Sequence, residues 1–332
     1  MRLTLTEPKT IFYDPKVYTS FPDIVLYNGS FLVIFRTGDS HHPEESSLYL
    51  ARSANGEHWD ISLFAHASIK QNGHVFNCPR INFINGILSV ICDIKTSRLE
   101  REASWDVLAW WSKNGENWRQ KSLGIMGMVP DKIIPLKNSL AMGYHVSETT
   151  ELVIGEGIKR TVIQMMAESL DGGETWRDRK TIAVSDKHSF CEGSIVKLND
   201  NKLFCFMRDN RTAILRSQVT RSMDGGKSWG MPKPMDIWGH RIVAGVKRIE
   251  PYAGSIIGTF RNTTNRTLSL FIINPQNDRT QVLSIDTETN ENPFNYGYSG
   301  WVETDDGGLQ IVYYIQRNKE NPEVVTMKVI LH

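Results

Sequence analysis

The sequence predicts an all-β protein: a six-bladed β-propeller of four-stranded antiparallel sheets. Three observations support this fold class. A turn motif recurs along the chain, a short apolar run recurs in phase with it, and the apolar runs are too short for ordinary helices. A fixed period of about 50 residues is typical of arrays and propellers, in which each period supplies one unit.

The turn motif is complete at residues 169–176 (SLDGGETW) and 222–229 (SMDGGKSW). Two shorter copies, at 53–59 and 112–118, have Asn in place of Asp, and the motif serines lie at steps of 59, 57 and 53 residues. A short acidic or amide side chain can accept hydrogen bonds from nearby backbone N–H groups, and Gly supplies the positive φ of a tight turn. The Trp has an apolar body that can pack the turn against the sheet. We therefore expect four equivalent outer turns.

The apolar runs share one plan: a turn residue, a mostly apolar stretch, and a polar or aromatic residue at the end. Their β-branched and aromatic content predicts buried strands. The six copies are residues 29–36, 86–93, 138–145, 201–208, 254–261 and 307–314. Each run follows the opening of its unit, and we place the openings at Phe21-Pro22-Asp23, Cys78-Pro79-Arg80, Val129-Pro130-Asp131, Cys191-Glu192-Gly193, Lys247-Arg248 and Tyr298-Ser299. Residues 1–19 are expected to supply an outer strand that completes the last unit.

Length and composition set the outer limits. A repeat along all 332 residues favours one domain over residues 1–332. The 38 basic residues nearly balance the 37 acidic ones and form no basic stripe, which argues against a nucleic-acid partner. No apolar stretch is long enough to span a bilayer, and the N-terminus lacks the apolar core of a secretory signal. A cytoplasmic protein, or one released or assembled onto a virion without a signal, is expected.

The cysteines and histidines show no metal-ligand spacing, so we expect no metal and no cofactor. The four cysteines, Cys78, Cys92, Cys191 and Cys205, are interpreted as buried free thiols. His41 and His42 are interpreted as solvated loop residues because no third ligand accompanies them. His145 and His188 are interpreted as polar residues with satisfied hydrogen bonds.

In a propeller the first strand of every unit lines a central channel, so the six openings converge around one mouth. The openings bring together Asp23, Arg80, Asp131, Glu192, Arg248 and Tyr298, and the ends of the second strands add Arg36, Asp93, His145, Arg208 and Arg261. Acids, arginines and a tyrosine gathered in a concavity are typical of a site for a polar ligand. We predict substrate-binding roles for Arg208, Arg261, Arg36, Arg80, Asp23, Asp131 and Arg248.

The Ser-x-Asp-x-Gly-x-x-Trp turns resemble the Asp boxes of the sialidase (neuraminidase) superfamily, whose fold is a six-bladed β-propeller. Sialidases place a glutamate at the opening of the fourth blade and an arginine at the end of the next strand, and Glu192 and Arg208 resemble this pair. They place an active tyrosine in a Tyr-Ser sequence that opens the last blade, as at Tyr298-Ser299. A further arginine lies upstream of that tyrosine, and Arg261 is its counterpart.

Two positions depart from the family pattern. The family begins with an Arg-Ile-Pro sequence whose arginine helps to hold the substrate carboxylate, whereas this chain has Ser20-Phe21-Pro22-Asp23. Arg36 and Arg80 are the candidates to replace that arginine. The family's acid/base aspartate lies in the loop before the first Asp box, where Glu45 is our first candidate and Asp39 our second.

The resemblance implies a retaining exo-glycosidase that acts on a sialic-acid-like or other acidic sugar. Because such a sugar carries a carboxylate at its anomeric carbon, a neutral tyrosine polarised by Glu192 avoids the repulsion that an anionic nucleophile would meet. Arginines hold the carboxylate bidentately. Two alternatives stay open: a non-catalytic carbohydrate-binding propeller, such as a receptor-binding or adhesin module, and a propeller polysaccharide lyase that uses Tyr and His, with His145 as the nearest candidate. A packing role for Tyr298 and structural ion pairs for the arginines are the plain alternatives at residue level.

Overall fold

The structure is a computed structural model of the chain, and it describes residues 2–99, 103–151, 158–210, 216–276, 279–286, 295–317 and 319–332. Within these ranges it is built from β-strands and one short helix, α1 (Ile69–Asn72). No helix in the described ranges is long and apolar enough to cross a membrane. The prediction of an all-β fold is confirmed.

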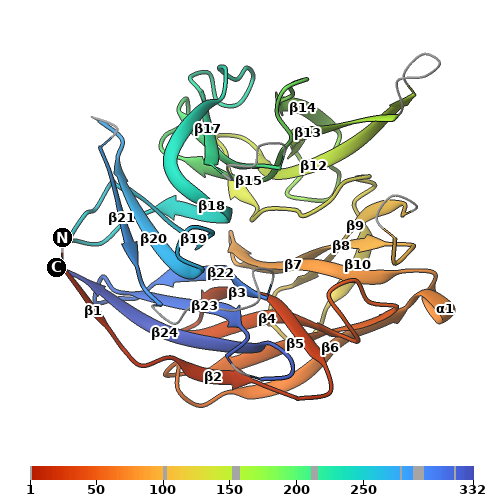
Figure 1. The fold of residues 1–332 in the computed structure, drawn as a ribbon, viewed down its shortest axis with the longest axis vertical. Coiled ribbons are helices and arrows are strands. Elements are labelled where there is room, and N and C mark those ends of the chain that lie inside the picture. Colours follow the sequence, from red (N-terminus) through yellow and green to blue (C-terminus); the bar gives the residue numbers. More distant parts are fainter. Residues whose placement is uncertain are drawn as a thin grey trace.

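The strands form five antiparallel sheets, which Figure 1 shows arranged around a common centre. The first two four-stranded sheets are β3 (Tyr18–Tyr27), β4 (Ser30–Gly38), β5 (Glu45–Ser53) and β6 (Asp60–Ser68), followed by β7 (Val75–Ile84), β8 (Ile87–Lys95), β9 (Trp105–Ser112) and β10 (Arg119–Ser122). The third is β11 (Ile134–Pro135), β12 (Leu140–Glu151), β13 (Ile158–Ser169) and β14 (Asp178–Ala183).

The fourth sheet has seven strands in sequence order. They are β15 (Phe190–Lys197), β16 (Leu203–Asp209), β17 (Arg216–Ser222), β18 (Lys233–Val246), β19 (Ile256–Asn262), β20 (Thr267–Asn274) and β21 (Arg279–Ser284). The first part of β18 pairs with β17, and its second part, from Gly239 to Val246, pairs with β19. One long strand therefore belongs to two successive four-stranded groups.

The predicted opening of the fifth unit at Lys247-Arg248 is wrong. The strand that pairs with β19 is the second part of β18, and Arg248 follows that strand at its other end. The reason is that β18 continues without a break from the outer strand of the preceding group, so no turn residue marks where the unit begins.

The fifth sheet joins the two ends of the chain. Its strands β22 (Tyr296–Glu303), β23 (Leu309–Ile315) and β24 (Glu323–Leu331) pair in order, and β24 also pairs with β1 (Leu3–Leu5) and β2 (Lys9–Phe12). The termini consequently lie side by side in Figure 1. The prediction that the N-terminal residues complete the last unit is confirmed.

The core is divided into layers between neighbouring sheets. One apolar cluster joins Leu32 and Ile34 of β4 to Leu88 and Val90 of β8, and the other clusters repeat this plan between later sheets. All four cysteines are free and buried, as expected. Each sheet is therefore held by burial of apolar side chains against the next one.

The four outer turns share one hydrogen-bond pattern. The motif serine Oγ accepts from the backbone N–H of Gly56, Gly115, Gly173 or Gly226 at 2.8–2.9 Å. All four of these glycines have positive φ, as the sequence pattern predicts. In the third turn the Trp176 indole N–H also donates to the Gly173 carbonyl at 3.0 Å, so the local sequence fixes each turn.

A second repeated feature positions the functional side chains. One residue with positive φ lies where a first strand opens, at Phe21 (56°), Val129 (50°), Glu192 (51°), Arg241 (48°) and Gly297 (76°). The pairing of the first strand with the second shifts register beside four of them: Phe21, Glu192, Arg241 and Gly297. A β-bulge of this kind re-aims a side chain. We call these five positions the opening bulges.

Candidate active site

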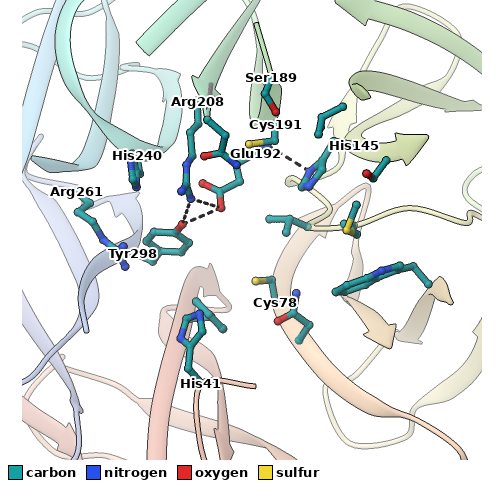
Figure 2. Close-up of a pocket in the computed structure, with 18 of the residues that line it drawn as sticks. His41, Cys78, His145, Ser189, Cys191, Glu192, Arg208, His240, Arg261 and Tyr298 are labelled. Atoms are coloured by element: carbon teal, nitrogen blue, oxygen red, sulfur yellow. Dashed lines mark hydrogen bonds and ion pairs between the residues drawn. The ribbon is translucent and has the colours of Figure 1, made fainter. Parts of the chain in front are cut away.

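A cavity of about 440 Å³ lies where the opening bulges meet, and side chains from all five sheets line it. Figure 2 shows Glu192, Arg208 and Tyr298 together on one side of the cavity, with Cys78 across from them and His145 next to the Glu192 backbone. Apolar groups, including Trp105, Met128 and Val129, line part of the wall. The cavity is thus a concave site in which a compact group of polar side chains lies beside apolar ones.

Tyr298, Glu192 and Arg208 form that polar group. The Tyr298 hydroxyl donates to Glu192 Oε1 at 2.8 Å. Arg208 Nη1 donates to the same carboxylate oxygen at 3.0 Å and to the Tyr298 hydroxyl oxygen at 3.0 Å. The second carboxylate oxygen, Glu192 Oε2, is buried without a hydrogen-bond partner among the described residues. The structure therefore joins a residue of β15, one of β16 and one of β22 within hydrogen-bond distance.

Charge in this group is set by burial and by neighbouring cations. Burial by itself raises the pKa of the Glu192 carboxyl, but the guanidinium groups of Arg208 and Arg241 outweigh it and lower that pKa to about 2. Burial and the negative charge of Glu192 raise the pKa of the Tyr298 phenol above its ordinary value. At neutral pH the pair is an ionised carboxylate that accepts a hydrogen bond from a neutral phenol.

Arg261 packs against the ring of Tyr298. Its guanidinium carbon is 4.2 Å from the centre of the Tyr298 ring, which is a cation–π contact. Its Nε donates to the Tyr296 carbonyl at 2.7 Å and its Nη2 to the Tyr314 hydroxyl at 2.8 Å. Arg261 lines the cavity, yet two of its donors are already engaged, so it supplies positive charge more than free hydrogen bonds.

Four histidines line the cavity: His41, His42, His145 and His240. His145 Nδ1 lies 3.3 Å from the Glu192 backbone N–H, which donates to it and so helps to fix the opening bulge. Burial lowers the pKa of both His41 and His240 to about 3, with Arg36 as the next cause for His41 and Arg208 for His240. Both imidazoles are uncharged at neutral pH.

The two acid/base candidates lie elsewhere. Glu45 begins β5 with an exposed side chain 3.5 Å from His66, and Asp39 Oδ1 accepts from the Glu44 backbone N–H at 3.2 Å. Both line a separate depression beside α1. The loop that we expected to deliver a carboxyl group delivers His41 instead, because its turn directs the two carboxylates outward. The interpretation of His41 as a solvated loop residue is wrong, because its side chain lines the cavity.

Arg36 is fully buried and does not line the cavity. The Phe21 ring, which does line it, lies 4.7 Å from the Arg36 guanidinium carbon. Arg36 Nη2 donates to the His41 carbonyl at 3.1 Å. Arg36, one of the two candidates to replace the first arginine of the family pattern, is therefore covered by the ring of Phe21.

Asp23, Arg80 and Asp131 connect the sheets to one another beneath the cavity. Asp23 Oδ2 accepts from the Ile81 N–H of the next sheet at 3.0 Å, and Asp131 Oδ2 accepts from the Ile195 N–H at 2.8 Å. Arg80 is buried beside Asp23, at 3.9 Å. The predicted substrate-binding role does not fit these three residues, because none of them lines the cavity and their charges face the protein interior.

Arg248 is also outside the site. It is exposed beyond the end of β18, and its backbone N–H donates to Glu303 at 2.9 Å. The arginine at the fifth opening bulge is Arg241, which is buried and donates to the Pro130 carbonyl at 3.3 Å. Its positive charge helps to lower the pKa of the Glu192 carboxyl.

Comparison with known proteins places the fold. No protein-family model matches the chain, and no curated protein does. Among solved structures, a protein of unknown function from Dyadobacter fermentans has a TM-score of 0.83 at 16% identity, with 99% of each chain covered. An α-L-arabinanase from Penicillium chrysogenum has a TM-score of 0.69 at 15% identity, with 98% of each chain covered.

A leech intramolecular trans-sialidase, solved with 2,7-anhydro-Neu5Ac, has a TM-score of 0.69 at 12% identity, covering 98% of this chain and 70% of the other. The chain shares a β-propeller fold with these structures, and at such identities the likeness shows the fold alone.

The sequence interpretation missed His240 and Arg241 as neighbours of the site. The signal was the tripeptide Gly239-His240-Arg241. In β18, His240-Arg241 occupies the register shift that Cys191-Glu192 occupies in β15. It could be aligned with the other openings only once the unbroken course of β18 was known.

Proposed function

We propose that the protein is a retaining exo-glycosidase that removes a terminal sugar bearing a carboxylate, as sialidases do. The observation that carries the proposal is the 2.8 Å hydrogen bond from Tyr298 to Glu192, with Arg208 donating to both partners. A nucleophile, its base and a group that orients them are the three parts that covalent catalysis needs.

The proposal treats the chain as a six-bladed propeller. Division of the seven-stranded sheet at β18 gives two four-stranded blades that share this strand, and the other four sheets supply one blade each. The four Ser-containing outer turns then correspond to Asp boxes. In this arrangement Glu192 belongs to the fourth blade and Tyr298 to the sixth, the same blades that bear their counterparts in sialidases.

The chemistry follows from the charges. The Tyr298 oxygen attacks the anomeric carbon, its proton passes to Glu192 Oε1, and the bond to the leaving oxygen breaks as that oxygen takes a proton from solvent. A water molecule then attacks the anomeric carbon and releases a proton to solvent, while Glu192 returns its proton to the tyrosine oxygen. A neutral phenol suits a substrate whose carboxylate would repel an anionic nucleophile, so a carboxylate sugar is the substrate class that this pair favours.

The pKa of Glu192 sets a condition on this step. With a pKa of about 2, Glu192 is a weak base in the free protein. A substrate carboxylate beside Arg208 neutralises part of the positive charge that lowers the pKa of Glu192. The bound substrate therefore raises this pKa towards the working pH, where a general base is most effective. Substrate binding and activation of the base are coupled in this account.

The balance of charge in the cavity also favours an anion. Among the described residues that line it, Arg208 and Arg261 are cationic and Glu192 is the one carboxylate, while His41 and His240 are uncharged. The net positive charge attracts an anionic ligand, and the low exposure of both arginines strengthens the attraction.

A second candidate function is elimination by a polysaccharide lyase that acts on a uronic acid polymer. It is favoured by one observation: no described residue lining the cavity supplies a second carboxyl group, whereas four supply an imidazole. A neutral histidine can remove the proton next to a carboxylate, and Tyr298 can protonate the leaving oxygen. The products differ, because elimination leaves an unsaturated sugar that absorbs ultraviolet light.

The test is a panel of fluorogenic glycosides that includes several nonulosonic acids and uronic acids, with ultraviolet absorbance recorded in parallel on uronic acid polymers. Release of fluorophore from an acidic glycoside by the wild-type protein, and its loss in Tyr298→Phe, would support the glycosidase. Full activity in Tyr298→Phe would exclude the proposed nucleophile. Binding of saccharides without turnover would indicate the carbohydrate-binding alternative, and ultraviolet-absorbing products would indicate the lyase.

A further inference from the structure

His240 is a buried histidine whose ring makes no hydrogen bond within the described ranges. Its residue is 7% exposed, it lines the cavity, and neither Nδ1 nor Nε2 has a hydrogen-bond partner there. Buried polar groups in native proteins are nearly always paired, and an unpaired one costs stability. A free imidazole in a cavity wall is therefore a group that a ligand can complete.

The fold directs His240 towards the arginines. In the antiparallel pairing of β18 with β19, His240 lies directly opposite Arg261, so the two side chains share one face of the sheet. Figure 2 shows His240 beside Arg208 and Arg261, on the same side of the cavity as Tyr298. The groups whose charge acts on His240 are Arg208 of β16, Glu192 of β15 and Arg261 of β19.

We propose that His240 is the third anion-binding group of the cavity, and that it takes up a proton from solvent when a sugar carboxylate binds beside Arg208 and Arg261. The proposal rests on the proposed function and adds the way in which the site holds its substrate. Phe21 supplies no positive charge at the first opening, and a protonated His240 supplies a third positive charge to the cavity instead.

The proton balance is simple. In the empty cavity burial and two guanidinium groups hold the imidazole neutral. A bound carboxylate adds one negative charge, which favours the imidazolium form and turns both ring nitrogens into donors. One proton moves from solvent to His240, no other bond changes, and the site gains a charge-assisted hydrogen bond. Affinity should therefore weaken as pH rises between the pKa of His240 in the free protein and its pKa in the complex, and it should not depend on pH above that interval.

Isothermal titration calorimetry of the full chain tests this coupling directly. N-acetylneuraminate and glucuronate serve as probes at pH 6, each in two buffers of different ionisation enthalpy, so that proton uptake per bound anion is measured. We expect uptake approaching one proton by the wild-type protein. His240→Gln should bind about 10- to 100-fold more weakly and take up no proton.

Two control variants separate the possible sources of the proton. His66→Gln, which removes an exposed histidine of β6 outside the cavity, should match the wild-type protein. Glu192→Gln should still take up a proton if the site of uptake is His240. Should His240→Gln fail to fold, the ring signals of His240 in the wild-type protein, followed by NMR as the probe is added, report its protonation.

The outcomes distinguish this inference from the proposed function. Binding without proton uptake, or equal uptake in His240→Gln, overturns the role of His240 and leaves the glycosidase proposal standing. Coupled uptake without any glycoside turnover supports the role of His240 and counts against the glycosidase. Failure of both probes to bind the wild-type protein overturns both.

Discussion

The openings of the first and fourth groups of strands share one backbone and differ in chemistry. Phe21 and Glu192 both occupy an opening bulge, with φ of 56° and 51°, and both line the cavity. Phe21 covers a buried arginine, whereas Glu192 exposes a carboxylate to a tyrosine and an arginine. The repeat thus decides where a side chain is aimed, and the residue type at each bulge decides whether that position supplies an apolar or a charged group to the cavity.

The fourth opening should respond to mutation in activity. Glu192→Gln keeps the shape of the side chain and an oxygen acceptor for Tyr298 but removes the base. We expect kcat/KM for an acidic fluorogenic glycoside to fall about 10²- to 10⁴-fold, which is the usual contribution of a general base. Circular dichroism would verify the fold, and a loss of less than threefold would show that Glu192 does not accept the proton.

The first opening should respond in stability. Phe21→Ala removes a buried ring that packs on Tyr298, Tyr314 and Arg36. We expect the free energy of unfolding to fall by about 3–5 kcal/mol, as measured by urea titration. Phe21→Leu is the matched control and should lose less. An unchanged unfolding midpoint in Phe21→Ala would contradict the packing role.

The two neutral histidines of the cavity, His41 beside Phe21 and His240 beside Glu192, should make stability depend on pH. Their folded pKa of about 3 lies below the ordinary 6.5, so the unfolded chain binds protons that the folded protein does not. Stability is complete above pH 6.5 and is lost as pH falls towards 3, by up to about 1.4 kcal/mol per pH unit for each histidine. Urea midpoints between pH 7.5 and 4.5 measure this slope, and His41→Gln or His240→Gln should each reduce it. An unaltered slope in both variants would place the titration elsewhere.

The outer turns should affect neither chemistry nor specificity. Ser169 lies seven residues along β13 from Val162, which lines the cavity, so the two are about 23 Å apart. Ser169→Ala removes the acceptor for the Gly173 N–H and should lower the free energy of unfolding by about 1 kcal/mol. The catalytic rate at saturating substrate should be unchanged. A clear fall in that rate would mean that the outer turns influence the cavity.

Much of the fold could be predicted because its signals are local. Each outer turn is specified by a serine, an acid or amide and a glycine within a few residues, and each apolar run by its own alternation with turn residues. The pairing of Glu192 with Tyr298 was also within reach, because repeat position places both at one mouth and the family resemblance links them.

The remaining residues depended on side-chain direction and long-range packing. Asp23 and Asp131 have the composition of ligand groups, yet their oxygens are used by backbone N–H groups of the next sheet. Glu45 has the right place in the loop, but only a three-dimensional path shows which side of the loop faces the cavity. His240 was hidden because β18 passes from one group of strands to the next without a turn.

Trapping of a covalent intermediate tests whether Tyr298 is the nucleophile. The full chain is incubated with a nonulosonic acid fluoride that carries a second fluorine beside the anomeric carbon, and the product is analysed by intact-mass spectrometry and peptide mapping. We expect one added glycosyl group per chain, on the peptide that contains Tyr298, and none in Tyr298→Phe. A glycosyl group on another residue, or turnover of acidic glycosides by Tyr298→Phe at the wild-type rate, would contradict this expectation.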